Sequence, residues 1–404
     1  MKNLEAIRQD FPCLRRQVDG KPLVYFDSAA TAQVPQVVID AISTANATLR
    51  ANVHRGVHTL SAEATEAMER TREKVRAFLG AESTQEIIFT RGTTEGINLV
   101  AASFGELLEA GDEIIVTEME HHSNIVPWQL LVSRRGVVVK PAPILDDGTL
   151  DLEALEALFT PRTRLVAVTH ASNVLGTINP VADIAAMAHA HGARILVDGA
   201  QAVPHLSVDV RAIDCDFYAF SAHKLYGPTG VGVLYGKREL LEKMPPYQGG
   251  GEMIGTVSFA GTTFADLPFK FEAGTPNFID IIAFAAALDY FRALDLTQIA
   301  AHEQALLDEA TRGISAIPGA RVFGTAANKC PVLSFLIGND SSYDIGLLLD
   351  KMGIAIRTGH HCAEPLMTRF GVRGMARASL SFYNTSAEVE RFVAATARAA
   401  AMLS

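Results

Sequence analysis

The sequence has no uninterrupted apolar stretch that approaches the roughly 20 residues of a membrane-spanning helix. Its start, MKNLEAIRQDFPCL, mixes charges into a short amphipathic pattern and lacks the apolar core and cleavage site of a signal peptide. It also lacks a CxxC pair, and Cys13, Cys215, Cys330 and Cys362 are widely scattered, as is usual in a reducing compartment. We therefore expect a soluble, cytoplasmic protein with no membrane partner.

No run of Lys or Arg is long enough to track a phosphate backbone. The 35 basic and 45 acidic residues give a net charge of −10, which makes nucleic acid an improbable partner. No low-complexity linker and no internal repeat is visible. The 404 residues, 49% of them hydrophobic, are enough for a large buried core and for more than one domain.

Short apolar runs alternate with amphipathic segments from residue 85 onward, which predicts an α/β fold with a mainly parallel sheet flanked by helices. One amphipathic segment, VADIAAMAHAHG, ends at Gly192, a residue typical of a helix C-cap. The expected strands are EIIFT (86–90), EIIVTE (113–118), RLVAVTH (164–170), ARILVD (193–198), DFYAFS (216–221) and GVGVLYG (230–236).

The order of elements changes after a helical segment at 280–316, which is followed by Pro318 and Gly319. RVFG, PVLSFLIG, IAIRTG and RASLSFY then read as strands around a helix near 343–352, and Thr385 with Glu388 predicts a capping box for a last helix at 386–403. We expect a smaller α+β domain at 295–404 that carries Cys362. The predicted large cofactor-binding domain is 21–294, and residues 1–20 are expected to pack on the small domain.

Polar side chains stand where several predicted strands end. VDGAQ places Asp198 at the end of a strand, and FSAHK places Ser221, His223 and Lys224 at the end of another. A helix cap is the simpler interpretation of Asp198 alone, and a solvated loop is the simpler one for Lys224 alone. Open α/β sheets, however, bind ligands at this edge.

Two further strand ends add His121 and the start of a helix at Gly92, Thr93 and Thr94. Backbone NH groups and hydroxyls at a helix start can bind phosphate. Together the strand ends predict one pocket with a phosphate site, a lysine, a carboxylate and a flat ring. A pyridoxal phosphate (PLP) site requires these parts, because the lysine bonds to the cofactor and the carboxylate keeps its ring nitrogen protonated.

RTGHHCAEPL (357–366) could be a metal site, a nucleophile on a loop or an ordinary turn. Three adjacent residues cannot all point at one ion without severe distortion, so we expect no metal. A satisfied turn is the default for most such segments. Cys362, however, follows two histidines and has Arg357 close by, an electropositive setting that favours a reactive thiolate.

The chain resembles the class V aminotransferase family, and within it most closely the group II cysteine desulfurases of the SufS type. The resemblance covers almost the whole sequence. It implies PLP fold type I, a homodimer with active sites near the interface, and conversion of L-cysteine to L-alanine with sulfur held as a cysteine persulfide. The stretches that carry it are YFDSAATAQVP, NVHRGVHTLS, RGTTEGIN, EHHSNIVPW, THASNVLGT, VDGAQAV, FSAHKLYGPTG, FEAGTPN and RTGHHCAEPLM.

The resemblance also implies roles for individual residues. Lys224 would be the Schiff-base lysine, Cys362 the persulfide nucleophile, and His121 the residue that stacks on the ring and moves protons. Asp198 would pair with the ring nitrogen and Gln201 would donate to the phenolic oxygen. The remaining implied contacts are to the cofactor phosphate, by Thr93, Thr94, Ser221, His223 and, from the other subunit, Thr275, and to the substrate, by Asn173, Arg377, Arg357 and His54.

Other functions stay open at this level. A selenocysteine lyase could use the same site without the thiol, and an aminotransferase would need no cysteine on the loop. A silent subunit that only docks a sulfur-transfer assembly would need neither Lys224 nor Cys362. The short Cys362 segment favours handoff to a separate acceptor of the SufE or SufU type for iron–sulfur cluster assembly.

Overall fold

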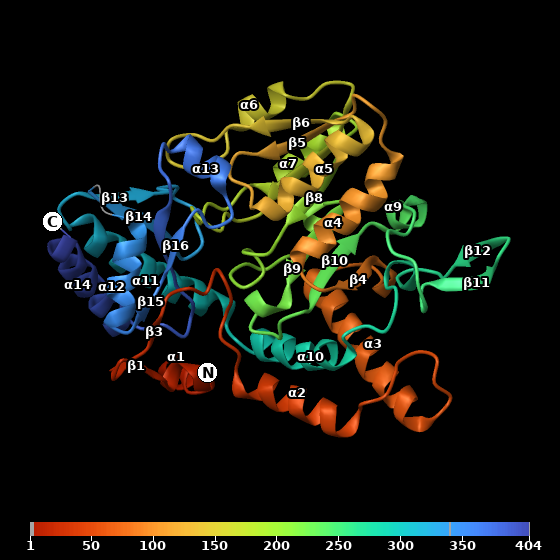
Figure 1. Ribbon diagram of the computed structural model, residues 1–404, viewed down its shortest axis with the longest axis horizontal. Helices are drawn as coiled ribbons and strands as arrows, with labels where there is room; N and C mark the ends of the chain where they lie inside the picture. Colours follow the sequence, from red (N-terminus) through yellow and green to blue (C-terminus); the bar gives the residue numbers. More distant parts are fainter. Residues whose placement is uncertain (1–3, 339–340, 404) are drawn as a thin grey trace.

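The computed structural model describes residues 4–338 and 341–403, so residues 1–3 of the predicted N-terminal segment lie outside it. Figure 1 shows a large sheet flanked by helices, a smaller sheet with its own helices beside it, and a hairpin that projects from the opposite side. Within the described residues, no helix is both long enough and apolar enough to cross a membrane.

The central sheet has the strand order β4-β10-β9-β8-β7-β5-β6. β10 is antiparallel to both of its neighbours, whereas the other pairs described in this sheet are parallel. The prediction of a mainly parallel sheet is therefore confirmed. Its strands are β4 (Ile87–Thr90), β5 (Glu113–Thr117), β6 (Val138–Ala142), β7 (Thr163–Thr169), β8 (Arg194–Asp198), β9 (Phe217–Ser221) and β10 (Gly232–Gly236).

Helices cover this sheet, and in Figure 1 α10 lies beneath it against α2 and α3. Gly192 has φ +75° just beyond α7, so the predicted C-cap glycine takes the left-handed conformation there. The α-helices of this part are α2 (Gln36–Thr48), α3 (Thr59–Leu79), α4 (Thr93–Phe104), α5 (Val126–Arg135), α6 (Leu152–Ala157), α7 (Val181–Ala190), α8 (Val210–Ile213), α9 (Arg238–Lys243) and α10 (Phe278–Arg292). The short 3₁₀ helices are η1 (Pro12–Arg15), η2 (Thr84–Glu86), η3 (Gly105–Leu107), η4 (His122–Asn124), η5 (Ala222–Lys224) and η6 (Phe269–Phe271).

The second sheet is antiparallel, with the order β13-β14-β17-β16. The predicted capping box is confirmed, because Thr385 N donates to Glu388 Oε2 at 3.0 Å and Glu388 N donates to Thr385 Oγ1 at 3.3 Å. The strands are β13 (Ala320–Phe323), β14 (Val332–Ile337), β16 (Arg357–Gly359) and β17 (Met375–Ser379). The helices around them are α11 (Leu296–Ser315), α12 (Ser342–Lys351), α13 (Glu364–Arg369) and α14 (Ser386–Leu403).

Two predictions for this part are corrected. The segment 280–316 is two helices, α10 and α11, because the Asp295 side chain accepts from the backbone NH groups of Thr297 and Gln298 and starts a new helix. IAIRTG is likewise divided: β15 (Ile354–Ala355) pairs with β3 (Val24–Tyr25), and only the residues after it join the four-stranded sheet.

The N-terminal residues pack against α14 and the segments that follow β9 and β17. Phe11 is fully buried, with its ring 4.9 Å from that of Tyr383 and 6.2 Å from that of Tyr226. Arg8 pairs with Glu388 of α14 at 2.7 Å. The division of the chain at 20/21 and 294/295 stays a prediction. The remaining elements are α1 (Leu4–Arg8), β1 (Gln17–Val18), β2 (Lys21–Pro22) and the projecting hairpin β11 (Ile254–Ser258) and β12 (Gly261–Phe264).

Candidate active site at the carboxyl ends of the central strands

A cavity of about 190 Å³ opens where the carboxyl ends of the central strands meet the second sheet. This is the edge at which open α/β sheets bind ligands. The structure therefore brings together side chains that are far apart in sequence. The predicted site residues that line the cavity are Thr93, Thr94, His121, Asn173, Asp198, Gln201, Ser221, His223, Lys224, Arg357 and Arg377.

Asp198 and Lys224 both line this cavity, and both have shifted pKa values. Asp198 ends β8 at 4% exposure, and burial raises the pKa of its carboxyl group. Burial also lowers the pKa of Lys224 to about 8, although the charge of Asp198 acts in the opposite direction. The site therefore holds a carboxylate that a cation would stabilise and an amine that is partly neutral near physiological pH.

The start of α4 lies at one end of the cavity and is suited to an anion. Thr93 N donates to Ser221 Oγ at 2.8 Å, and the two hydroxyls are also 2.8 Å apart. Gly232 of β10 passes so close to this turn that a Cβ on it would lie 2.3 Å from Gly92 Cα. Strands β9 and β10 thus fix the helix start, whose NH groups and hydroxyls can bind phosphate.

His223 completes this end of the cavity. Its Nδ1 lies 3.1 Å from Thr31 Oγ1, and burial, followed by the charge of Lys224, lowers the pKa of His223 to about 4. The ring is therefore neutral at physiological pH. A neutral imidazole beside a phosphate acts through a hydrogen bond rather than through charge.

His121 presents a flat, neutral ring to the cavity. Ser123 N donates to His121 Nδ1 at 3.1 Å, which leaves the ring proton on Nε2. Burial, together with the charge of Lys224, lowers the pKa of His121 to about 3. The ring can therefore stack on a planar ligand, and its Nε2 can donate a hydrogen bond.

Two arginines of the second sheet, Arg357 and Arg377, also line the cavity. Arg377 is 1% exposed, donates through Nη1 to Asn173 O at 2.9 Å, and pairs through Nη2 with Asp27 Oδ1 at 2.9 Å. Within the described part of the chain, Arg377 Nε has no hydrogen-bond partner. Arg357 lies beside it on β16. The cavity has positive charge available for a small carboxylate.

The turn that carries Cys362 is held beside the cavity, and Cys362 itself is half-buried. His361 and Cys362 both have positive φ, at 52° and 56°, a strained conformation for residues other than glycine. The turn is fixed from both sides: Asn173 Nδ2 donates to His361 O at 2.9 Å, and His122 N donates to Cys362 O at 2.7 Å. The thiol is therefore on a short, anchored segment.

One alternative for the Cys362 turn was a metal site. Across residues 4–338 and 341–403, no group of three or more His, Cys, Asp or Glu side chains is arranged to hold a metal ion. The imidazole of His361 instead donates through Nε2 to Met375 O at 3.0 Å.

Three predicted residues are not among the side chains that line this cavity: Cys362, on the turn described above, His54 and Thr275. His54 precedes α3, where its Nε2 is 3.1 Å from Glu69 Oε1 and its ring packs on Phe269. His54 therefore does not line the cavity of its own chain, and its sharing of a pocket with Arg357 stays a prediction. Thr275 lines a separate cavity of about 370 Å³ beside β4 and α4. Its predicted entry into another subunit's site stays a prediction.

Three residues around the site had no predicted role. Asp27 pairs with Arg377, and His361 lines the cavity. Glu120 is fully buried behind His121, accepts from Thr169 N at 2.8 Å and from Asn124 Nδ2 at 2.7 Å, and has its pKa raised to about 8 by burial. One indication in the sequence that Glu120 belongs to the site is that it stands directly before the histidine pair in EMEHHSN.

Comparison with known proteins places this geometry in a family. Residues 24–392 match the family model described as aminotransferase class-V. A cysteine desulfurase of Salmonella agona (strain SL483) is 56% identical over 397 residues, 98% of each chain. The Escherichia coli cysteine desulfurase CsdA, in an S-sulfonic acid form, superimposes with a TM-score of 0.93 at 40% identity over 100% of both chains. A variant of C-DES with glycine covalently linked to the PLP cofactor is 25% identical, with a TM-score of 0.82 over 96% of this chain and 98% of that one.

Proposed function

The chain belongs to the class V aminotransferase family, and from this membership we propose that it is a PLP-dependent cysteine desulfurase. It converts L-cysteine to L-alanine and keeps the sulfur as a persulfide on Cys362. The observation that carries the proposal is the anchored turn that presents Cys362 beside a cavity lined by Lys224 and Asp198. The 56% identical relative with the same activity supports it.

The residues of the cavity fit PLP. Asp198 offers a buried carboxylate to the protonated ring nitrogen, His121 offers a flat ring, and the start of α4 with Ser221 offers a phosphate site. When bound, PLP supplies an electron sink for the carbon skeleton of the substrate.

Side chains of the protein bind the substrate, transfer its protons and accept its sulfur. Arg377 and Asn173 hold the substrate carboxylate, and the amine of Lys224 takes the proton from the α-carbon. The thiolate of Cys362 attacks the substrate sulfur, so that an S–S bond forms and the C–S bond breaks with its electron pair left on carbon. The ammonium group of Lys224, which holds the α-carbon proton, can protonate that carbon on the way to alanine, and His121 can donate a hydrogen bond through Nε2 to the reacting groups.

The assembly we propose is a homodimer that places Thr275 and His54 at the neighbouring active site. This accounts for their positions outside the cavity of their own chain. The persulfide then passes to an acceptor protein of the SufE or SufU type for iron–sulfur cluster assembly. A cytoplasmic location agrees with the four free cysteines.

The experiment that tests the reaction measures alanine release from L-cysteine and from L-selenocysteine, after visible absorbance has confirmed bound PLP. Cys362→Ala should abolish release from cysteine and spare release from selenocysteine, whose C–Se bond is weaker. Cys13→Ala, which changes another half-buried cysteine, is the matched control and should behave as wild type. Intact cysteine activity in Cys362→Ala would refute the proposed nucleophile.

The acceptor is tested separately. Turnover at limiting reductant should be low alone and should rise when a SufE-type or SufU-type protein is added, because the anchored turn cannot carry the persulfide far. Equal rates with and without the acceptor would exclude the handoff.

A further inference from the structure

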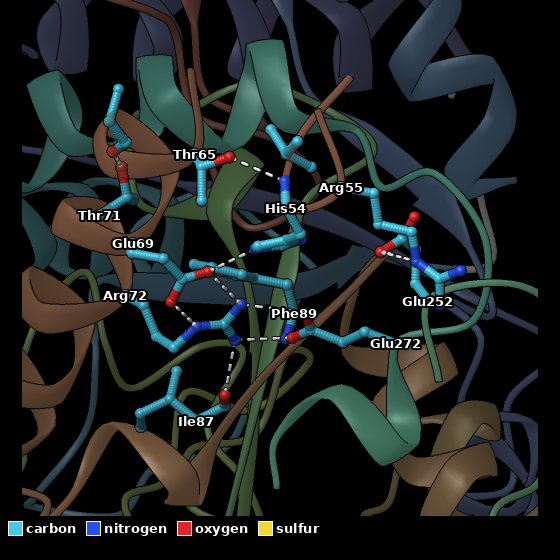
Figure 2. A network of polar contacts seen from close by, with 12 residues as sticks. His54, Arg55, Thr65, Glu69, Thr71, Arg72, Ile87, Phe89, Glu252 and Glu272 are labelled. Carbon is cyan, nitrogen blue, oxygen red and sulfur yellow. Dashed lines mark hydrogen bonds and ion pairs between the residues drawn. The ribbon is translucent and has the colours of Figure 1, made fainter. Parts of the chain in front are cut away.

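A buried arginine outside the cavity joins two segments that the proposed dimer requires. Arg72 of α3 is 0% exposed, and its guanidinium group lies 4.5 Å from the ring of Phe89 (Figure 2). Its Nε donates to Glu69 Oε2 at 2.8 Å. Its Nη1 and Nη2 donate to the two carboxylate oxygens of Glu272 at 2.6 and 2.9 Å. One guanidinium group therefore binds two carboxylates in a fork geometry that lysine cannot reproduce.

Each carboxylate leads to a residue with a proposed role. Glu69 Oε1 lies 3.1 Å from His54 Nε2, and Figure 2 shows the chain of contacts from His54 through Glu69 to Arg72. Glu272 stands three residues before Thr275 and also accepts from Phe89 N at 2.7 Å. Arg72 thus links the turn before α3 to the segment that carries Thr275.

The cluster remains charged although Arg72 and Glu272 are buried and Glu69 is only partly exposed. Burial opposes the charged form of Arg72, but Glu272 and Glu69 raise its pKa above the ordinary value. Burial also opposes ionisation of Glu69, yet the hydrogen bonds from His54 and Arg72 lower its pKa to about 2. A buried charged network is weak as a stabilising device, because apolar side chains of similar size can replace such networks without loss. The fork contacts of Arg72 with Glu69 and Glu272 instead suit a role in holding other residues in position.

We propose that Arg72 is a positioning residue for the neighbouring subunit's active site, acting through Glu69 on His54 and through Glu272 on Thr275. The inference rests on the proposed desulfurase dimer. Because the carboxylate of Glu69 can only accept, His54 Nε2 carries a proton and donates to Glu69 Oε1. The cluster therefore sets the ring orientation that the neighbouring site meets.

The test compares His54→Ala, Glu69→Ala, the double variant and Glu66→Ala. Glu66 pairs with Arg70 on the same helix in an exposed i,i+4 contact and is the matched control. Glu69→Ala should lower kcat/KM for cysteine about tenfold, to the level of His54→Ala, and the double variant should fall no further. Glu66→Ala should match wild type. Arg72→Lys, which keeps the charge but loses the fork, should resemble Glu69→Ala.

Mixed dimers separate positioning from a local structural role. Co-expressed Glu69→Ala and Lys224→Ala chains, purified through two different tags, should recover activity well above either homodimer. In the mixed dimer, the Lys224→Ala chain supplies a correctly held His54 to the intact Lys224 site. The affinity for L-alanine, read from the change in PLP absorbance, should recover in parallel.

Different results would overturn the positioning role of Arg72 and the proposed desulfurase function. Independent, multiplying effects of His54→Ala and Glu69→Ala, or no recovery in the mixed dimer, would overturn the inference and leave the proposed function standing. A wild type that binds PLP but releases no alanine from cysteine would overturn the proposed function and the inference with it.

Discussion

Arg357 and Arg377 lie directly opposite each other on the antiparallel strands β16 and β17, and both line the cavity. Like charges in this register repel, and Asp27 balances one of them at 2.9 Å. The remaining positive charge is a cost to the fold unless an anion binds beside the two arginines in the cavity. The carboxylate of an amino acid substrate is such an anion.

Arg377→Lys should therefore weaken substrate binding. It removes the Nη contacts to Asn173 O and Asp27 while keeping the charge. We expect KM for cysteine to rise by about tenfold or more with a smaller change in kcat, which steady-state alanine release would measure. Arg373→Lys, an exposed position nearby, is the control. An unchanged KM in Arg377→Lys would contradict the assigned carboxylate contact.

The lowered pKa of Lys224 gives a prediction for cofactor uptake. An amine must be neutral to bond to the aldehyde of PLP, and burial lowers the Lys224 pKa to about 8, so a neutral amine becomes dominant above that pH. The rate of covalent PLP uptake by the cofactor-free protein should rise with pH and level off above about 8. Absorbance at a series of pH values measures it, with Lys224→Ala as the blank. A rate still rising steeply toward pH 10 would indicate an ordinary solvated lysine.

The strands of the central sheet could be predicted because their burial on both faces demands continuous apolar runs, as in RILVD and FYAFS. β6 was missed for the opposite reason. It is an edge strand, VVKPA, whose Lys140 and Pro141 contradict the pattern of a buried strand.

The site residues that lie at or just after the ends of strands could be predicted from the sequence, because the carboxyl ends of parallel strands lie at the same edge of the sheet. Asp198, Lys224 and His121 belong to that class. His54 does not, because its place is decided by Glu69 and Phe269, which are remote in sequence. The resemblance of motifs implied the other subunit's site for Thr275, but for His54 it gave no such distinction.

Gly232→Ala should weaken cofactor binding from outside the cavity. The new Cβ would lie 2.3 Å from Gly92 Cα, and backbone cannot yield as a flexible side chain does. The turn before α4 would have to shift, and the contact of Thr93 N with Ser221 Oγ would shift with it. We expect PLP to dissociate about tenfold faster, measured by loss of its absorbance during dialysis.

Gly251→Ala is the control for this change, because a Cβ at Gly251 meets nothing within 4 Å. Normal PLP retention in Gly232→Ala would show that the start of α4 does not hold the phosphate.

The four cysteines should differ sharply in reactivity. Cys215 and Cys330 are 0% and 3% exposed, and burial raises the pKa of both thiols, so neither offers thiolate to solvent. Cys362 and Cys13 are half-buried and reachable. Brief treatment of the folded protein with a maleimide, followed by peptide mass spectrometry, should find label on Cys362 and Cys13 alone.

Labelling also separates the two reachable thiols by function. Loss of alanine release should follow modification of Cys362 and should proceed at the same rate in Cys13→Ser, because only the Cys362 turn is anchored beside the cavity through Asn173 and His122. If Cys13→Ser protected the activity, the reacting thiol would be Cys13. The strained backbone at Cys362 would then need an explanation other than presentation of a nucleophile.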